Sequence, residues 1–261
     1  MFAKSTSRCK IKSMDASVLH LIAAFIIGCI VGLINVLAGG GSFLTLAFLI
    51  AIGLPPNVAN GTNRVGLVLQ NSFASFKFYK LNILKTRFGL AVAIPTLIGA
   101  LLGSFIAVHI PNELLKKIIA ILMVLISLIT IYKPERFAKK EPLNKKNWFF
   151  ILLAFFFIGI YGGFIQAGVG FFIIAASVWG GFSMVEANAI KVFLITLYTI
   201  LILPIFFISH QVNLLVGIFL GAGSILGAKA AIHLSIKKGD KFIRGVLLVI
   251  LVFFAVKLMF F

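Results

Sequence analysis

Residues 35–71 read NVLAGGGSFLTLAFLIAIGLPPNVANGTNRVGLVLQN, and this stretch combines two features that are rare in so hydrophobic a chain. Residues 39–42 (GGGS) cannot hold a lipid-facing helix, because consecutive glycines lose too much backbone freedom there. Residues 57–71 carry a cluster of amides together with Arg64, whose charge is costly inside a bilayer. Non-helical, polar backbone is tolerated at membrane depth only where protein or a water-filled cavity surrounds it. We therefore expect this stretch to line an internal solute site.

The rest of the chain has the composition of a polytopic membrane protein. Its 261 residues are 61% hydrophobic and 11% charged, whereas soluble domains are about 25% charged. Apolar segments long enough to span a bilayer recur from residue 17 to the end. The net charge of +18 would suggest nucleic acid in a soluble protein, but most basic residues lie in short connections, where they set topology and contact anionic lipid. We expect an all-α, multi-pass protein of the cell membrane without a nucleic-acid partner.

The second half of the chain repeats the pattern of the first. We place a basic N-terminal segment at 1–16, a first transmembrane repeat at 17–133, a basic cytoplasmic linker at 134–146 and a second transmembrane repeat at 147–261. Matching residues recur at nearly constant offsets, among them Gly28 and Gly159, Gly32 and Gly163, Asn35 and Gln166, Asn60 and Asn188, Gly99 and Gly223, and Gly103 and Gly227. Weak repeats that each contain a short, glycine-interrupted segment are typical of secondary transporters.

Each predicted repeat, of four to five helical elements, contains one apolar segment that is too short to span. Residues 42–53 would form about 18 Å of helix at about 1.5 Å per residue, which is roughly half of a bilayer. We therefore predict short broken or re-entrant half-helices after residues 39–41 and after Gly168 and Gly170. Asn57 is expected to cap the next helix. Later helices are predicted at 58–79, 184–209, 213–234 and 241–261.

The relative direction of the two repeats is left open by the distribution of charge. Four crossings and a re-entrant element in each half would make the repeats parallel, whereas five crossings would make them inverted. Lysine and arginine concentrate in cytoplasmic loops, but both assignments place an excess of them inside. The chain therefore has about eight to ten crossings.

The helix predicted at 58–79 carries a polar stripe. Polar side chains at spacings of three, four and seven share one helix face, and here they are Asn60, Asn63, Arg64, Gln70 and Asn71. Such a stripe faces a cavity or another polar helix, and interhelical hydrogen bonding alone is the alternative explanation. Arg64 favours the cavity, because packing does not need a charge and a guanidinium suits an oxyanion.

The second half offers a weaker counterpart of this site. Lys191 falls one position from the equivalent of Arg64, so we expect the two cations to be placed asymmetrically, about 100° apart around a helix. Snorkelling of Lys191 to an interface is the alternative. The glycines of both predicted breaks either permit close packing or interrupt the helices so that backbone N–H groups point at an anion. We favour the interruption, because three consecutive glycines exceed what packing requires.

Acidic residues are scarce, and Glu186 is the only candidate for one near membrane depth. Cation carriers usually hold carboxylates in the membrane, so a net positive interior favours a small anion. Cys9 and Cys29 provide neither a disulfide framework nor a metal cluster, and we expect no metal or cofactor. Ser42 raises an intramembrane serine hydrolase as a rival, but the four histidines lie at predicted segment ends and no His–carboxylate pair is evident.

Residues 39–42 (GGGS), followed by residues 59–63 (ANGTN), resemble the first-repeat signature of the sulfite exporter TauE/SafE family. Residues 187–191 (ANAIK) are similar to the weaker second-repeat counterpart, although Ala189 and Ile190 stand where the first repeat has glycine and threonine. The resemblance covers residues 17–257. It implies an integral membrane permease, built from a duplicated unit, that moves sulfite, organosulfonates or related small anions.

We therefore predict a non-enzymatic permease that binds a small anion near the membrane midplane between its two repeats. A passive anion channel is the alternative, and the serine hydrolase is less favoured. The expected partners are the anionic solute and the lipid bilayer; the sequence leaves the oligomeric state open, and a homodimer is one candidate. The candidate binding residues are Asn35, Gly39, Gly40, Gly41, Ser42, Asn60, Thr62, Asn63, Arg64, Gln166, Asn188 and Lys191.

Overall fold

The computed structural model describes residues 18–37, 39–119, 121 and 145–260, and within these ranges the regular secondary structure is entirely helical. The helices are α1 (Val18–Leu37), α2 (Gly41–Ala51), α3 (Pro56–Lys80), α4 (Thr86–His109), α6 (Lys145–Phe164), α7 (Val169–Trp179), α8 (Met184–Ile208) and α9 (Leu214–Phe260). A further helical stretch covers residues 112–119. The all-α prediction is confirmed.

Several helices of the described chain are suited to a bilayer. Among the described residues, four are long and apolar enough to cross it: Val18–Leu37, Thr86–His109, Met184–Ile208 and Leu214–Lys237. Large apolar side chains also point outward, for example Ile94, which is 65% exposed, and Phe157, which is 58% exposed. Such a surface is a liability in water and is what lipid requires. The chain is a multi-pass protein of the cell membrane, as predicted.

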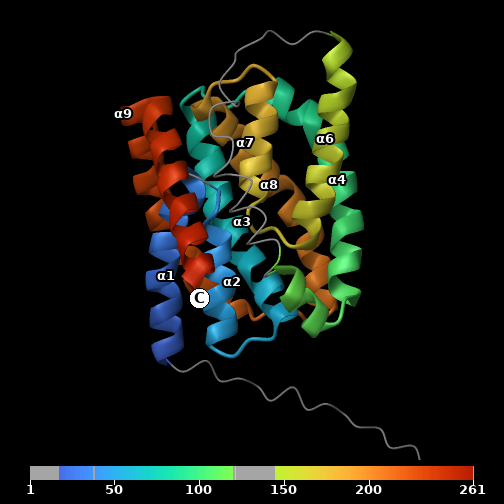
Figure 1. The fold of residues 1–261 in the computed structure, drawn as a ribbon, viewed down its shortest axis with the longest axis vertical. Coiled ribbons are helices and arrows are strands. Elements are labelled where there is room, and N and C mark those ends of the chain that lie inside the picture. Colours follow the sequence, from blue (N-terminus) through green and yellow to red (C-terminus); the bar gives the residue numbers. More distant parts are fainter. Residues whose placement is uncertain (1–17, 38, 120, 122–144, 261) are drawn as a thin grey trace, which may run out of the picture.

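Two outer helix pairs enclose the central helices α3 and α8 (Figure 1). α1 packs along α9 on one side of the molecule, and α4 packs along α6 on the other. Backbones touch in both pairs: a Cβ on Gly32 would lie 2.1 Å from the Ser224 carbonyl oxygen, and one on Gly103 would lie 2.0 Å from that of Ile160. Small residues allow this close approach, so the matching glycines of the two halves hold the outer pairs together.

The contacts between helices also give their directions. Gly28 lies against Leu220 and Gly32 against Ser224, so α1 and α9 run the same way. The glycines of α4 meet α6 in the same parallel sense. Short loops reverse the chain between α3 and α4 and between α8 and α9. Consequently α3 runs opposite to α6, and α1 runs opposite to α8.

The two halves of the chain therefore have opposed directions. Figure 1 shows α1 beginning at the lower end of the molecule and α6 at the upper end. α2 and α7 each have 11 residues, and α3 and α8 each have 25. These lengths and directions favour inverted over parallel repeats. The duplication itself stays a prediction, as do the domain boundaries; residues 1–16 and 134–144 lie outside the described residues.

α2 and α7 are the predicted half-helices, and each is only about 16 Å long at 1.5 Å per residue. Two details of the predicted segments are wrong. α3 begins at Pro56 rather than being capped by Asn57, because a proline's fixed φ and missing N–H suit the first helical turn. α9 is helical from Leu214 to Phe260 rather than two segments, since an internal glycine weakens a helix without ending it.

Candidate functional site

α3 is the polar helix at the centre of the molecule. Six of its polar side chains are at most 2% exposed: Asn60, Thr62, Asn63, Arg64, Gln70 and Asn71. So many polar side chains on one helix would be unstable in contact with lipid tails. It is covered by α8 and α9 instead, so the polar stripe faces protein.

The two helix breaks meet beside α3. Gly39 lies against Gly170, and a Cβ on Gly39 would be 2.8 Å from the Gly170 Cα. Gly39 has a φ of +86° and Gly168 one of +76°, a left-handed conformation that glycine adopts at little cost. These glycines therefore both interrupt the helices and allow close packing. As a result, the C-terminal ends of α1 and α6 converge with the N-terminal ends of α2 and α7.

Arg64 binds the C-terminal end of α6, in the other half of the chain. Its Nη1 donates to the carbonyl of Gly162 at 3.2 Å and to Gln166 Oε1 at 2.9 Å. Its Nη2 donates to the carbonyls of Gly163 at 2.6 Å and Phe164 at 3.4 Å. The last carbonyls of a helix lack partners within it and carry a partial negative charge. Arg64 satisfies these groups and places its charge where the helix end attracts it.

Lys191 of α8 does the same for α1. Its Nζ donates to the carbonyls of Asn35 at 2.7 Å and Val36 at 3.1 Å. The side chain passes Gly170, where an added Cβ would lie 3.0 Å from the lysine Cδ. Lys191 is 1% exposed, which excludes snorkelling to an interface. The two cations thus have equivalent contacts despite their one-residue offset, because each lies on the central helix of one half and binds the broken helix of the other.

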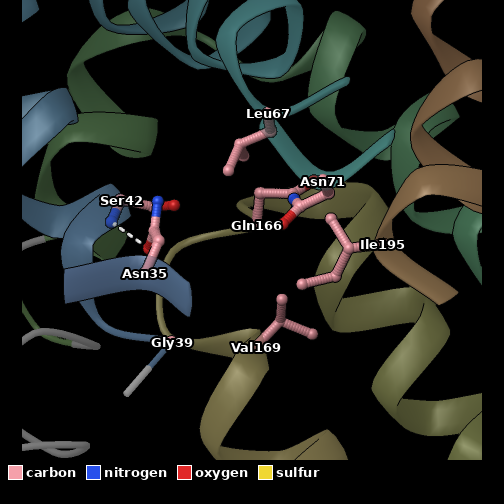
Figure 2. Close-up of a pocket in the computed structure, with 8 residues that line it drawn as sticks. All are labelled: Asn35, Gly39, Ser42, Leu67, Asn71, Gln166, Val169 and Ile195. Carbon is pink, nitrogen blue, oxygen red and sulfur yellow. Dashed lines mark hydrogen bonds between the residues drawn. The ribbon is translucent and has the colours of Figure 1, made fainter. Parts of the chain in front are cut away.

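A small cavity lies between the breaks and α3. Figure 2 shows the residues around it: Asn35, Gly39, Ser42, Leu67, Asn71, Gln166, Val169 and Ile195. The space between these side chains has room for about one water molecule. A larger solute therefore requires the two breaks to move apart.

Two amide nitrogens of this cavity, Nδ2 of Asn35 and Nδ2 of Asn71, have no hydrogen-bond partner among the described residues. The Asn35 amide has a definite orientation, because its Oδ1 accepts from the backbone N–H of Ser42 at 3.1 Å. The Oδ1 of Asn71 accepts from Gln70 Nε2 at 3.2 Å. A buried, unpaired donor costs about 1–3 kcal/mol. The cavity is therefore suited to a ligand that accepts hydrogen bonds.

The remaining predicted site residues are not among the eight that line this cavity. Asn60 Nδ2 donates to the Phe164 carbonyl at 2.8 Å, and Thr62 Oγ1 accepts from the N–H of Asn213 at 2.9 Å, so both tie α3 to neighbouring elements. Gly40 is the N-cap of α2, and Gly41 lies against Asn35. The amide nitrogens of Asn63 and Asn188 are buried and unpaired within the described part of the chain.

Sequence reasoning missed Tyr198 as a member of this site. Its hydroxyl accepts a hydrogen bond from Gln166 Nε2 at 2.9 Å, and the ring is fully buried. The available signal was its position seven residues after Lys191, which places both on one helix face. Asn71 was found in the polar stripe but was not assigned to the site. The apolar wall of Leu67, Val169 and Ile195 gave no signal.

Within the described residues no buried carboxylate offsets Arg64 and Lys191. Glu186, the one candidate for a carboxylate near membrane depth, forms a capping box with Ser183 at the start of α8. It also pairs with Lys85 at 3.0 Å and is 27% exposed. These contacts are those of a helix cap, so Glu186 does not offset the two buried cations.

The lining of the cavity also bears on the hydrolase alternative. None of its eight residues is a histidine or a carboxylic acid, so the lining offers Ser42 no general base. Among the described residues, no group of three or more His, Cys, Asp or Glu side chains could hold a metal ion.

Comparison with known proteins is consistent with this geometry. A family model described as "Sulfite exporter TauE/SafE" matches residues 24–258. The chain is 28% identical over 242 residues to "Probable membrane transporter protein ORF9" of a Sinorhizobium species, covering 92% of this chain and 93% of that protein. It is 27% identical over 237 residues to a "Probable membrane transporter protein" of Haemophilus influenzae, covering 90% of this chain and 93% of that protein. It is 26% identical over 245 residues to "Probable membrane transporter protein YfcA" of Escherichia coli, covering 94% and 91%.

No solved structure matches the chain. The family model, however, spans most of the sequence and includes both helix breaks, the polar helix α3 and both buried cations. The chain belongs to the sulfite exporter TauE/SafE family of membrane transporters.

Proposed function

We propose that this transporter is a permease for a small anion that binds where the two helix breaks meet. The proposed solutes are sulfite, an organosulfonate or a related sulfur-containing or carboxylate anion. One observation carries the proposal: Arg64 and Lys191 are buried with no carboxylate among the described residues to pair with them, beside a cavity that has two unpaired donors. Buried cations without an anionic partner are costly, and a bound anion would supply that partner.

The helix ends do not remove this positive charge. The C-terminal ends of α1 and α6 each carry about −0.5 of an elementary charge, and the N-terminal ends of α2 and α7 each carry about +0.5. These contributions nearly cancel, so the charges of the two side chains remain. An excess of positive charge in a low-dielectric interior supports an anion over a cation or a neutral solute.

The proposed contacts follow from which donors are free. In the empty site the terminal nitrogens of Arg64 and the Nζ of Lys191 already donate to protein acceptors, most of them helix-end carbonyls, so the two cations first attract the anion through their charge. Asn35 and Asn71 supply direct hydrogen bonds through their unpaired Nδ2 groups. The other predicted residues come within reach when the breaks separate.

The size of the cavity supports a carrier over a passive channel. Room for about one water molecule is too small for a continuous pore. A carrier needs a closed site that opens to one side at a time, and two half-helices that meet at a site are suited to such a motion.

Flux into proteoliposomes tests this proposal. We expect labelled sulfite to accumulate with saturating kinetics and to exchange with unlabelled sulfite on the other side, and we expect Arg64→Gln to lose this flux while Arg64→Lys keeps part of it. Non-saturating flux without exchange would indicate a channel. Unchanged flux in folded Arg64→Gln protein would refute the assignment of the site.

A further inference from the structure

Gln166 is the side chain that separates Arg64 from the cavity. Its Oε1 accepts from Arg64 Nη1 at 2.9 Å, and its Nε2 donates to the Tyr198 hydroxyl at 2.9 Å. The amide orientation is unambiguous, because an arginine can only donate and so must face the amide oxygen. Gln166 also lines the cavity that contains the unpaired donors of Asn35 and Asn71 (Figure 2).

The four hydrogen bonds of the Arg64 terminal nitrogens fall into two kinds. Three go to backbone carbonyls at the end of α6, which can leave only if the helix end itself moves. The fourth goes to the Gln166 side chain, which can change rotamer independently of the helix. The Oε1 of this amide is committed to Arg64, and one of the two N–H groups of its Nε2 is committed to Tyr198. It is the one Arg64 acceptor among these that a bound anion can replace without unwinding α6.

We propose that Gln166 is an internal stand-in for the transported anion: its amide oxygen occupies an Arg64 donor that the anion takes over, and Tyr198 positions it there. This inference rests on the proposed anion-permease function and changes the role of Gln166 from a ligand of the anion to its competitor. An oxyanion forms charge-assisted hydrogen bonds with a guanidinium, and these are about twice as strong as those of a neutral amide. The exchange therefore favours the anion, while Arg64 is never left without a partner in the empty state.

A neutral acceptor is essential to this role. Gln166→Glu would place a carboxylate against Arg64 in nearly the same shape and would turn the stand-in into a permanent internal anion. We expect the variant to bind sulfite at least about a hundredfold more weakly. We also expect a melting temperature in anion-free detergent above that of wild type, and no further rise when sulfite is added.

The matched control is Gln211→Glu. Gln211 is also buried, but its Nε2 donates to the Val108 carbonyl and no contact joins it to Arg64. A carboxylate cannot make that bond, so this variant should have a lower melting temperature than wild type. It should retain the melting-temperature rise on addition of sulfite. Equal loss of sulfite binding in both variants would overturn the proposal, because any buried negative charge would then have the same effect.

Two further variants test the sign of the effect, and they do not depend on the folding of Gln166→Glu. Gln166→Ala removes the competitor and should tighten sulfite binding by about tenfold in calorimetry, the equivalent of one hydrogen bond to a charged group. Tyr198→Phe removes only the tether and should tighten it by about threefold. If Gln166 were a ligand of the anion or only a packing residue, both variants would weaken binding or leave it unchanged.

The outcomes separate this inference from the proposed function. If wild type binds sulfite, Arg64→Gln does not, and Gln166→Ala binds more weakly than wild type, the stand-in role is refuted and the anion site remains. If wild type binds none of sulfite, methanesulfonate and acetate, the proposed function fails and the stand-in role fails with it. Tighter binding by Gln166→Ala together with loss of binding by Gln166→Glu would establish the role.

Discussion

Replacing Lys191 by methionine removes the charge that Lys191 brings to the end of α1 and leaves a side chain of similar length. The lysine Nζ donates to the carbonyls of Asn35 at 2.7 Å and Val36 at 3.1 Å. The Asn35 carbonyl keeps a second donor, the N–H of Gly39 at 2.9 Å. The loss therefore falls mainly on the Val36 carbonyl, which becomes a helix-end acceptor without its cation.

The magnitude follows from these contacts. A hydrogen bond to a charged group contributes about 1.5–3 kcal/mol. Removing a buried ammonium also recovers part of its desolvation cost, which offsets some of the loss. We expect Lys191→Met to lower the free energy of unfolding by about 2 kcal/mol. For a protein of this size that corresponds to a melting temperature lower by about 4–8 °C.

The assay is thermal unfolding of purified protein in detergent, followed by intrinsic fluorescence. Lys229→Met is the matched control, because Lys229 is an exposed lysine on α9 and its loss should change the free energy of unfolding by less than about 0.5 kcal/mol. A melting temperature of Lys191→Met equal to that of wild type would refute the reasoning. So would an equal decrease in Lys229→Met, since that would reflect lysine loss in general.

Three further predictions concern the breaks and the surface. Asn35→Asp keeps the acceptor for the Ser42 N–H but replaces the free donor with a negative charge. The melting temperature should change little, while calorimetry should show sulfite binding at least about tenfold weaker. Unchanged affinity would contradict the cavity assignment. In Gly53→Ala the added Cβ meets no atom within 4 Å, so the positive φ alone should lower the free energy of unfolding by about 1–2 kcal/mol. Gly39→Ala adds a clash with α7 and should melt at a clearly lower temperature than Gly53→Ala. Equal melting temperatures would show that the breaks do not touch. Glu186→Gln keeps a residue compatible with the capping box and loses an exposed ion pair worth less than about 1 kcal/mol. Flux in proteoliposomes should therefore be unchanged. Loss of flux would indicate that Glu186 is a carboxylate that couples transport to an ion.

The helix breaks were predictable because their causes are local. Residues 39–42 contain three consecutive glycines, and residues 42–53 are too few to cross a bilayer, so both the break and the half-helix follow from backbone physics. The polar stripe was predictable for the same reason, since spacing alone places Arg64 and Asn71 on one face. Their burial was predictable too, because placing these polar side chains in lipid costs free energy.

The contacts made by the cations were not predictable in the same way. Whether Arg64 meets the end of α6 depends on which helix of the other half lies beside α3, and that is set by the glycine contacts of the outer pairs. The one-residue offset of Lys191 suggested asymmetry, but a long, flexible side chain removes such an offset. Tyr198 gave little signal, because a buried tyrosine on an apolar helix is usually part of a core.

Anomalous diffraction from crystals grown with selenite tests the central claim most directly, because selenite resembles sulfite and contains a strong scatterer. The account predicts a selenium peak in the cavity between the two breaks, with its oxygens about 2.7–3.2 Å from Asn35 Nδ2 and Asn71 Nδ2. It also predicts that the Gln166 side chain has moved away from Arg64. A peak elsewhere in the protein, or an empty cavity at selenite concentrations that inhibit sulfite flux, would contradict the account.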